Sequence, residues 1–416
     1  MADVSELALK EIARCVRCGA CQAVCPAYAA TLREHAVARG KLHLIDKAVA
    51  GGEEKLQGRR LRDAISLCLK CGRCTVACPN SVETASVVRH VREAQFHQTP
   101  RNVKTIAAGE LLRSRGMLRG TVKALRAFAG VVARRAKDRP GLVMRLAAPG
   151  EGARRGLPEP PEKGFFEASR GRDVVVEGAG RRYLLFTGCV GDALRPQASE
   201  AMVSLARKAG LSLVAPAAQV CCGLMSYMTG DRAGAEDLVR RNLAVFAAHR
   251  ADAIVTACAS CAVMLKEHFK EIVPDATLPE VLTLSELWAR ELKGRLTPGA
   301  EARDAAAIAF HEPCHLAVGL KVKAQPRELL GSLKGARYVK TAGEDLCCGY
   351  GGAFNVEHYK ESRAIGSRKK KSYKEKDVRL VATECAGCTL QLIDVLADCE
   401  EPVEVISTAE ALDKFH

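Results

Sequence analysis

Aromatic residues are scarce in this chain. They make up 4% of its 416 residues, and there is a single tryptophan. Proteins that bind single-stranded nucleic acid stack its bases on aromatic side chains. The formal net charge of +15 therefore does not by itself indicate nucleic acid, and we expect no nucleic-acid partner.

Long apolar runs are also missing. No stretch of about 18 apolar residues occurs, so we expect no membrane span. The first residues, M-A-D-V-S-E-L-A-L-K-E, lack the basic-then-apolar order of a secretory signal. We therefore expect a cytoplasmic protein that reaches the inner face of a membrane, if at all, through a partner.

Two common cofactor motifs are absent as well. There is no G-x-G-x-x-G after an apolar strand and no C-x-x-C-H, the patterns that accompany dinucleotide binding and covalent haem attachment. Flavin, nicotinamide and haem are therefore expected on partner subunits.

The positive charge is concentrated in one segment. From Arg101 to Arg172 there are 17 basic and 6 acidic residues, and Ala124–Arg135 is predicted as an amphipathic helix. This basic arm is a docking face for an acidic partner or a membrane surface, or it is a solvated helix. The run R-K-K-K at Arg368–Lys371 is predicted as a solvated helix face that an acidic partner could also use.

Cysteine is abundant, with nineteen residues in the chain. In a chain without an export signal, C-x-x-C spacing favours metal ligation over disulfides. Eight of them form two runs of the type C-x2-C-x2-C-x3-C-P, the bacterial ferredoxin signature: Cys15, Cys18, Cys21 and Cys25, then Cys68, Cys71, Cys74 and Cys78.

In such a signature three close thiolates hold one [4Fe–4S] cubane and the fourth reaches the other cubane. We therefore predict one cluster on Cys15, Cys18, Cys21 and Cys78, and a second on Cys68, Cys71, Cys74 and Cys25. Zinc is the alternative, although a zinc ribbon needs neither the third cysteine nor the Cys-Pro. The stretch between Cys25 and Cys68 is longer than a compact ferredoxin needs, which indicates a helical form of the two-cluster domain.

Ten further cysteines form an internal repeat, in the order lone Cys, adjacent pair and C-x-x-C. The offset between corresponding cysteines of the two copies is nearly constant, which indicates two repeated structural units. The copies are Cys189, Cys221, Cys222, Cys258 and Cys261, and then Cys314, Cys347, Cys348, Cys385 and Cys388. Only Cys399 is left over, and its apolar surroundings predict a buried structural thiol.

Short apolar strands alternate with helices in both copies, which predicts parallel sheets with each cysteine group at or just after the carboxyl end of a strand. The fold class is α+β multidomain: an all-α two-cluster ferredoxin domain (1–98), a basic helical arm and linker (99–180), and two repeated α/β domains (181–296 and 305–416). Residues Leu296–Asp304 join the two repeats.

Lone Cys, C-C-G and C-x-x-C, doubled behind a two-cluster ferredoxin, resemble the CCG-domain iron–sulfur family. One branch is the iron–sulfur subunit of glycolate and lactate oxidases, which A-R-G-K-L-H-L-I, H-E-P-C-H-L, P-R-E-L-L and L-C-C-G-Y-G-G-A-F-N resemble. The other is heterodisulfide reductase, in its D-like form, which fuses a ferredoxin domain to the repeat. The glycolate branch usually lacks the first cysteine of one or both C-x-x-C pairs, whereas this chain keeps Cys258 and Cys385. That departure weakens the resemblance to the glycolate branch and favours a full set of special clusters, so both branches stay open.

The resemblance implies two cubane [4Fe–4S] clusters and two non-cubane [4Fe–4S] clusters, each of the latter on the five cysteines of one repeat. It implies an oxidoreductase subunit that passes electrons between a partner flavoprotein and these clusters. The alternative is a subunit that itself reduces a disulfide at the non-cubane clusters. A zinc-stapled scaffold or nucleic-acid binder is the third reading.

Two histidines flank the lone cysteine of the second repeat. His311 and His315 can act as proton donors or as hydrogen-bond partners that tune the cluster. Their structural alternative is turn capping or core packing.

Overall fold

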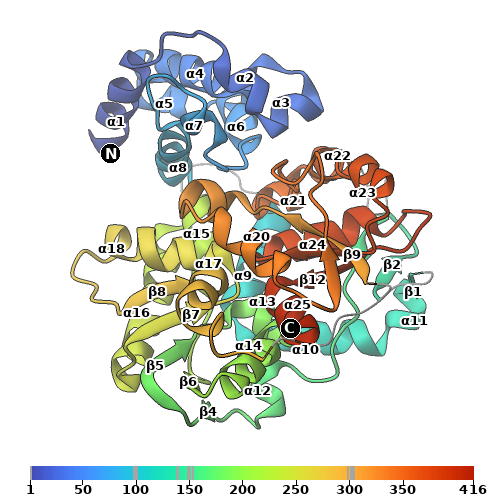
Figure 1. Ribbon diagram of the computed structural model, residues 1–416. Helices are drawn as coiled ribbons and strands as arrows, with labels where there is room; N and C mark the ends of the chain where they lie inside the picture. The colour runs from blue at the N-terminus through green and yellow to red at the C-terminus, as the bar shows by residue number, and fades with distance from the viewer. Residues whose placement is uncertain are drawn as a thin grey trace.

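The computed structural model describes residues 2–96, 102–136, 140–147, 151, 154–297, 299 and 305–416. Its N-terminal domain is entirely helical and sits at one end of the molecule, above the two repeats (Figure 1). The elements of this domain are α1 (Ala2–Ala13), α2 (Ala20–Val24), α3 (Pro26–Thr31), η1 (Glu34–Ala36), α4 (Ala38–Ala50), α5 (Glu53–Leu56), α6 (Arg59–Ser66), α7 (Arg73–Val76) and α8 (Thr84–Gln95).

Apolar residues at helical spacing build the core of this domain. Leu42 and Ile45 of α4, Ile65 of α6 and Val88 of α8 are all buried in one cluster. The expected helical form of the two-cluster domain is thus what the chain adopts, and α4 ends at the glycine pair that follows it.

The basic segment is only partly helical. Its elements are α9 (Val103–Arg113), α10 (Arg115–Ala127), α11 (Ala129–Val132), β1 (Ala133–Arg135), β2 (Leu142–Met144), β3 (Gly156–Leu157) and α12 (Phe165–Ala168). The helix predicted over Ala124–Arg135 breaks at Phe128, and β1 pairs antiparallel with β2, which pairs with β3. Sequence reasoning missed this small sheet because its strands are very short.

The first repeat is built on a five-stranded sheet of order β4-β6-β5-β7-β8. All neighbours are parallel except β4, which runs antiparallel along the edge beside β6. Its elements are β4 (Val174–Val176), β5 (Ala179–Leu185), α13 (Gly188–Ala193), α14 (Pro196–Lys208), β6 (Leu211–Ala215), α15 (Leu224–Thr229), α16 (Arg232–His249), β7 (Ala253–Thr256), α17 (Ala259–Val263), η2 (Met264–His268), α18 (Phe269–Ile272), β8 (Glu280–Thr283), α19 (Leu284–Leu287) and η3 (Trp288–Leu292). Strand β4 lies within the segment that the sequence assigned to the linker, so this sheet begins before residue 181.

The second repeat is built on a four-stranded parallel sheet of order β10-β9-β11-β12, which is the first sheet without its antiparallel edge strand. Its elements are β9 (Ala306–His311), η4 (His315–Gly319), α20 (Ala324–Gly331), β10 (Ala336–Tyr338), α21 (Ala353–Glu357), α22 (Tyr359–Ser367), α23 (Lys370–Glu375), β11 (Leu380–Thr383), α24 (Ala386–Leu396), β12 (Glu404–Ser407) and α25 (Thr408–Phe415). The two parallel sheets confirm the predicted fold class.

The repeats extend beyond their cysteines. The last strand of each leads into a short helix that begins with the same capping box, made by Thr283 with Glu286 and by Ser407 with Glu410. In this motif the side chains at the N-cap and at the third helical position satisfy each other's free backbone N–H groups.

These terminal helices are exchanged between the repeats. Helix α25 of the second repeat packs on α14 of the first, and α19 with η3 of the first packs on α20 of the second. The Arg195 guanidinium lies 3.0 Å from a Glu410 carboxylate oxygen, and the Ser204 hydroxyl donates to Asp413 at 2.7 Å. The two repeats therefore form one continuous core.

The basic arm lies against both repeats. Arg115 and Arg119 each lie 3.0 Å from a carboxylate oxygen of the buried Asp192 in α13, and Thr105 donates to Glu357 at 2.7 Å. Part of the arm's positive charge is thus used inside the protein. The joining segment Leu296–Asp304 lies mostly outside the described residues, and in the described part of the chain no helix has the length and apolarity needed to cross a membrane.

Candidate metal centre

The first ferredoxin motif surrounds a small cavity that is lined by residues of the N-terminal domain. It has a volume of about 30 Å³, and among its lining residues are Cys15, Cys18, Cys21 and Cys78. The backbone passes through left-handed conformations at Arg17 (φ 55°) and Gly19 (φ 89°). Such turns point successive backbone N–H groups into one concavity, which suits an anionic group such as a thiolate-bound cluster.

The second motif repeats this geometry around its own cavity. Lys70 (φ 55°) and Gly72 (φ 71°) take the left-handed positions, and the cavity of about 30 Å³ is lined by Cys68, Cys71, Cys74 and Cys25, among others. Each motif's fourth cysteine therefore lines the cavity of the other motif. Cys74 lines both cavities.

All ten cysteines of the two repeats line one further cavity, of about 170 Å³. They approach it from the carboxyl ends of strands in the two sheets and from the loops that follow. The Cys348 and Cys388 sulfurs are 3.4 Å apart, and Ser260 of the first repeat lies 3.1 Å from the Cys385 sulfur of the second. The sequence spacing gives two sets of five, and the fold makes them face each other across one space.

Several thiols of these cavities are costly to ionise without a cation. Burial raises the pKa of Cys71 to about 11 and also raises the pKa of Cys25. Burial raises the pKa of Cys314 well above its ordinary value, and the neighbouring Cys71 thiol raises it further. A metal cation removes this cost because it binds the thiolate form. Clustered sulfur donors without carboxylates suit iron–sulfur clusters or zinc, and the eighteen motif cysteines are all free thiols.

The N-terminal domain touches the repeats through its second motif. Cys71 lines both its own cavity and the large one. A Cβ placed on Gly72 would lie 2.8 Å from Val318 Cγ1, so only glycine allows this approach. Lys70 donates to the Met228 carbonyl, and Arg73 lies 3.6 Å from Asp345.

Buried cations that the sequence analysis did not identify accompany the cysteines. Lys41 and Lys70 lie beside the second ferredoxin motif, and burial lowers the pKa of both ammonium groups while neighbouring thiols raise it. Arg92 donates to the carbonyls of Ile65, Ser66 and Cys68, which holds the entry to that motif. A positive group beside each site offsets the negative charge of bound thiolates.

The run R-K-K-K was predicted as a solvated face, and for Lys369 that prediction is wrong. Its side chain is fully buried and donates to the carbonyls of Gly343 and Glu344. Burial lowers the pKa of Lys369 to about 8, against the raising effect of the Cys348 and Cys347 thiols. A charge run does not reveal which member turns inward.

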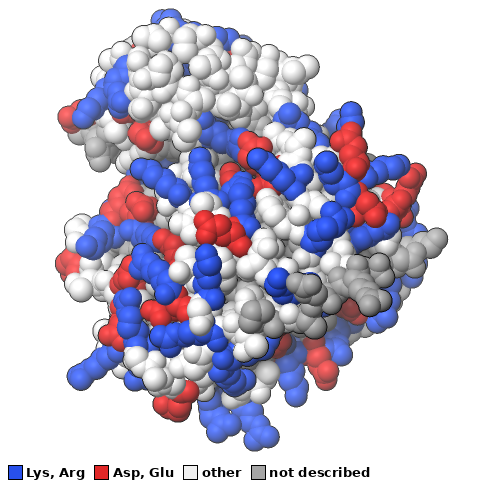
Figure 2. All heavy atoms as spheres, viewed as in Figure 1, with Lys and Arg blue, Asp and Glu red and all other residues white. Residues whose placement is uncertain are grey.

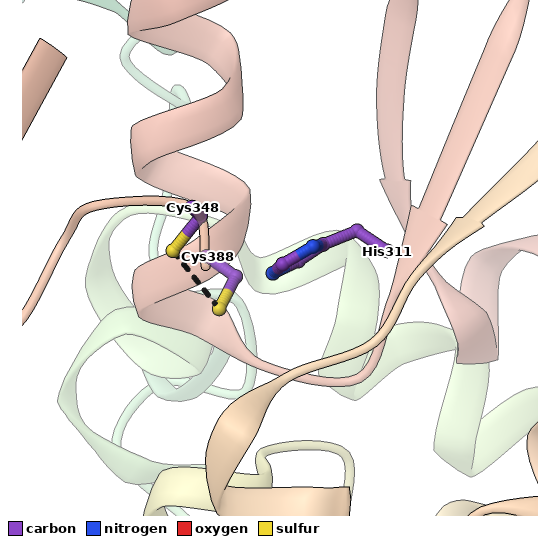
Figure 3. A group of neighbouring side chains, drawn as sticks. All are labelled: His311, Cys348 and Cys388. Atoms are coloured by element: carbon purple, nitrogen blue, oxygen red, sulfur yellow. Dashed lines mark hydrogen bonds between the residues drawn. The ribbon is translucent and has the colours of Figure 1, made fainter. Parts of the chain in front are cut away.

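The two flanking histidines occupy different environments. His315 Nδ1 lies 2.8 Å from the Ser260 hydroxyl, which joins it to Cys385. His311 is 1% exposed, and its ring points toward Cys348 and Cys388, with one nitrogen and both sulfurs within 4.8 Å of one another (Figure 3). Neither ring nitrogen of His311 has a hydrogen-bond partner of ordinary geometry among the described residues.

Comparison with known protein families accounts for both parts of the chain. Residues 11–82 match a family described as a 4Fe-4S dicluster domain, and residues 183–266 and 308–393 each match the cysteine-rich domain called CCG. The first of these matches names iron–sulfur clusters, rather than zinc, as the metal of the N-terminal motifs.

Curated relatives agree with these matches. The chain is 26% identical over 401 residues to the probable glycolate oxidase iron-sulfur subunit of Bacillus subtilis, covering 92% of this chain and 88% of that protein. It is 25% identical to the glycolate oxidase iron-sulfur subunit of Escherichia coli, covering 91% and 89%. It is 31% identical to a fumarate reductase (CoM/CoB) subunit of Methanothermobacter marburgensis, covering 60% of this chain and 48% of that protein.

Proposed function

Because the chain belongs to the CCG-domain iron–sulfur proteins, we propose that it is the electron-transfer subunit of a multi-subunit oxidoreductase and receives electrons from a partner flavoprotein that oxidises a 2-hydroxyacid. An iron–sulfur electron-transfer role follows from its two kinds of domain and from its relatives. The flavoprotein partner and the hydroxyacid are the part that we propose.

One observation carries the proposal: three cysteine-lined cavities follow one another through the protein. Cys74 lines both the first and the second, and Cys71 lines both the second and the third. Clusters in neighbouring cavities would each lie beside the cysteine that lines both cavities, so that electrons pass between the clusters inside the protein. Such a series is what a subunit needs if it accepts electrons at one end and delivers them at the other.

The outer end of the series has the properties of an entry point. Cys18 is exposed, and the apolar side chains of Val16 and Val76 beside the motif are 65% and 67% exposed. On the face that Figure 2 shows, the N-terminal domain carries fewer charged side chains than the repeats. An exposed apolar patch at a redox site favours a protein partner.

We assign the cubane clusters to the two crossed sets, Cys15, Cys18, Cys21 with Cys78 and Cys68, Cys71, Cys74 with Cys25. We assign one further, non-cubane [4Fe–4S] cluster to the five cysteines of each repeat. When bound, these clusters supply one-electron transfer. The chain's own part is to hold the thiolates, to exclude water from the inner sites and to set their electrostatic surroundings.

Iron analysis of anaerobically purified protein tests the cofactor part of the proposal. Four four-iron clusters give about 16 iron atoms per chain with equal acid-labile sulfide, and empty repeats would leave about 8. Co-purification of the native complex, followed by 2-hydroxyacid-dependent dye reduction, tests the partner. A complex that lacks a flavoprotein would overturn that part and leave the clusters in place.

A second function is favoured by one specific observation, the complete sets of five cysteines around a shared cavity of about 170 Å³. Such a site could accept a small disulfide between two clusters and reduce it to thiols with two electrons and two protons. His315 lines this cavity, His311 lies beside Cys348 and Cys388, and both are candidate proton donors. Disulfide reduction by reduced viologen, measured beside the 2-hydroxyacid assay on the same preparation, separates the two functions.

A further inference from the structure

The two repeats differ at one position that faces their cysteines. His311 stands three places before Cys314, and Phe186 stands three places before Cys189. The sheet register gives the same equivalence. His311 pairs with Thr383 in β11, and Phe186 donates its N–H to Val255 of β7 immediately before Thr256, the counterpart of Thr383.

The phenyl ring of Phe186 lies in an apolar environment that suits it. It is fully buried and packs edge-on against Phe246, with ring centroids 6.0 Å apart. It also lies beside Gly188, at which an added Cβ would come within 3.0 Å of the Cys261 sulfur. The first repeat therefore presents an apolar ring near its cysteines.

The imidazole of His311, at the equivalent position, lacks a hydrogen-bond partner of ordinary geometry among the described residues. A buried polar group without a partner costs about 1–3 kcal/mol, and the contact between His311 and the Cys348 thiol falls outside ordinary hydrogen-bond geometry. Figure 3 shows that the ring projects from the end of β9 toward the Cys348 and Cys388 sulfurs. A thiolate that binds iron accepts a hydrogen bond from such a ring, whereas thiols without iron hydrogen-bond to one another.

A second difference between the repeats adds positive charge near the cysteines of the second repeat. Lys369 stands as far before Cys385 along the chain as Asn242 stands before Cys258, and both side chains are fully buried. The Lys369 ammonium donates to the carbonyls of Gly343 and Glu344, whereas the neutral Asn242 amide donates to the carbonyls of Cys221 and Leu238. The second site thus has an imidazole and a cation where the first has a phenyl ring and a neutral amide.

We propose that His311 donates a ring N–H to a cluster thiolate of the second repeat and thereby makes that centre more easily reduced than the centre of the first repeat. A donor or a positive charge near a cluster stabilises its reduced, more negative form. The two facing sites are then chemically unlike, and an electron that enters the shared cavity region comes to rest on the second repeat. This inference rests on the proposed presence of a cluster in each repeat.

The test is a pair of reciprocal variants, His311→Phe and Phe186→His, each followed by an EPR-monitored redox titration of the full-length protein. We expect His311→Phe to move the midpoint potential of the second centre to more negative values, toward that of the first. Phe186→His should move the first centre in the opposite direction. Iron content is measured on the same samples, so that a change in potential is separated from loss of a cluster.

Nitrogen hyperfine coupling is a second readout. Wild-type protein labelled with ¹⁵N-histidine should show a histidine nitrogen coupled to one repeat centre, and His311→Phe should lose it. Unchanged potentials and no nitrogen coupling, in protein with about 16 iron atoms per chain, would overturn the role of His311. Iron at about 8 atoms per chain in the wild type would instead overturn the proposed clusters, which distinguishes the two failures.

Discussion

Serine substitution of the two Cys-Pro cysteines tests the crossed ligand sets directly. Cys78 lines the cavity of the first motif, and Cys25 lines the cavity of the second. Removing either thiolate leaves one cubane with three cysteine ligands. Since each cubane holds four irons of a total of about 16, complete loss of one cluster lowers the iron content to about 12 per chain.

Iron content alone does not say which cluster is lost, so the assay needs two reference variants. Cys18 lines the first cavity and Cys71 lines the second. Cys18→Ser therefore reports loss of the first cluster and Cys71→Ser loss of the second, whichever way the fourth ligands cross. We expect the EPR spectrum of Cys78→Ser to match that of Cys18→Ser, and that of Cys25→Ser to match Cys71→Ser. The opposite pairing would refute the crossed assignment, even if every variant lost a quarter of its iron.

Three further changes test other parts of the structure. Gly72→Ala and Gly52→Ala both place a side chain at positive φ, which costs about 1–2 kcal/mol, but only at Gly72 would the Cβ meet another side chain, 2.8 Å from Val318. Rapid-mixing reduction should show slower electron transfer to the repeats in Gly72→Ala alone, and equal rates in the two variants would contradict the contact. Asp192→Asn leaves Arg115 and Arg119 without their buried carboxylate and should lower the free energy of unfolding by about 3 kcal/mol in denaturant titration. Its control is Asp237→Asn, which removes an exposed pair with Arg241 worth about 0.3–0.5 kcal/mol, and a similar loss in both would argue against the anchoring role of Asp192. Cys399→Ser should leave iron and acid-labile sulfide unchanged, and a loss of iron would show that this nineteenth cysteine has a ligand role.

Much of the fold follows from local patterns. The strands that end near Cys189, Cys258, Cys314 and Cys385 are short apolar runs, and each was predicted close to where it lies. The short strands β4, β8 and β12 were missed. The patterns T-L-S-E and S-T-A-E at the starts of α19 and α25 are capping boxes that could have identified where the last helix of each repeat begins.

The arrangement of the candidate site depends on contacts distant in sequence. Spacing alone predicts two sets of five cysteines, but it does not say that Cys258 and Cys385 approach one cavity from opposite repeats. It gives no sign that Lys369 turns inward from a run of four basic residues, or that Gly72 lies against Val318. These features come from tertiary packing, which local periodicity does not encode.

The exchange of terminal helices has a consequence for biogenesis. Domains generally fold in order as a chain leaves the ribosome, but the outer face of α14 in the first repeat is covered by α25, the last helix of the described chain. The first repeat thus stays open until α25 has been synthesised, and the space between the repeats closes only when α25 packs on α14. We therefore expect iron and sulfide to reach the ten inner cysteines only after α25 has left the ribosome, and removal of α25 should yield protein with filled ferredoxin motifs and empty repeats.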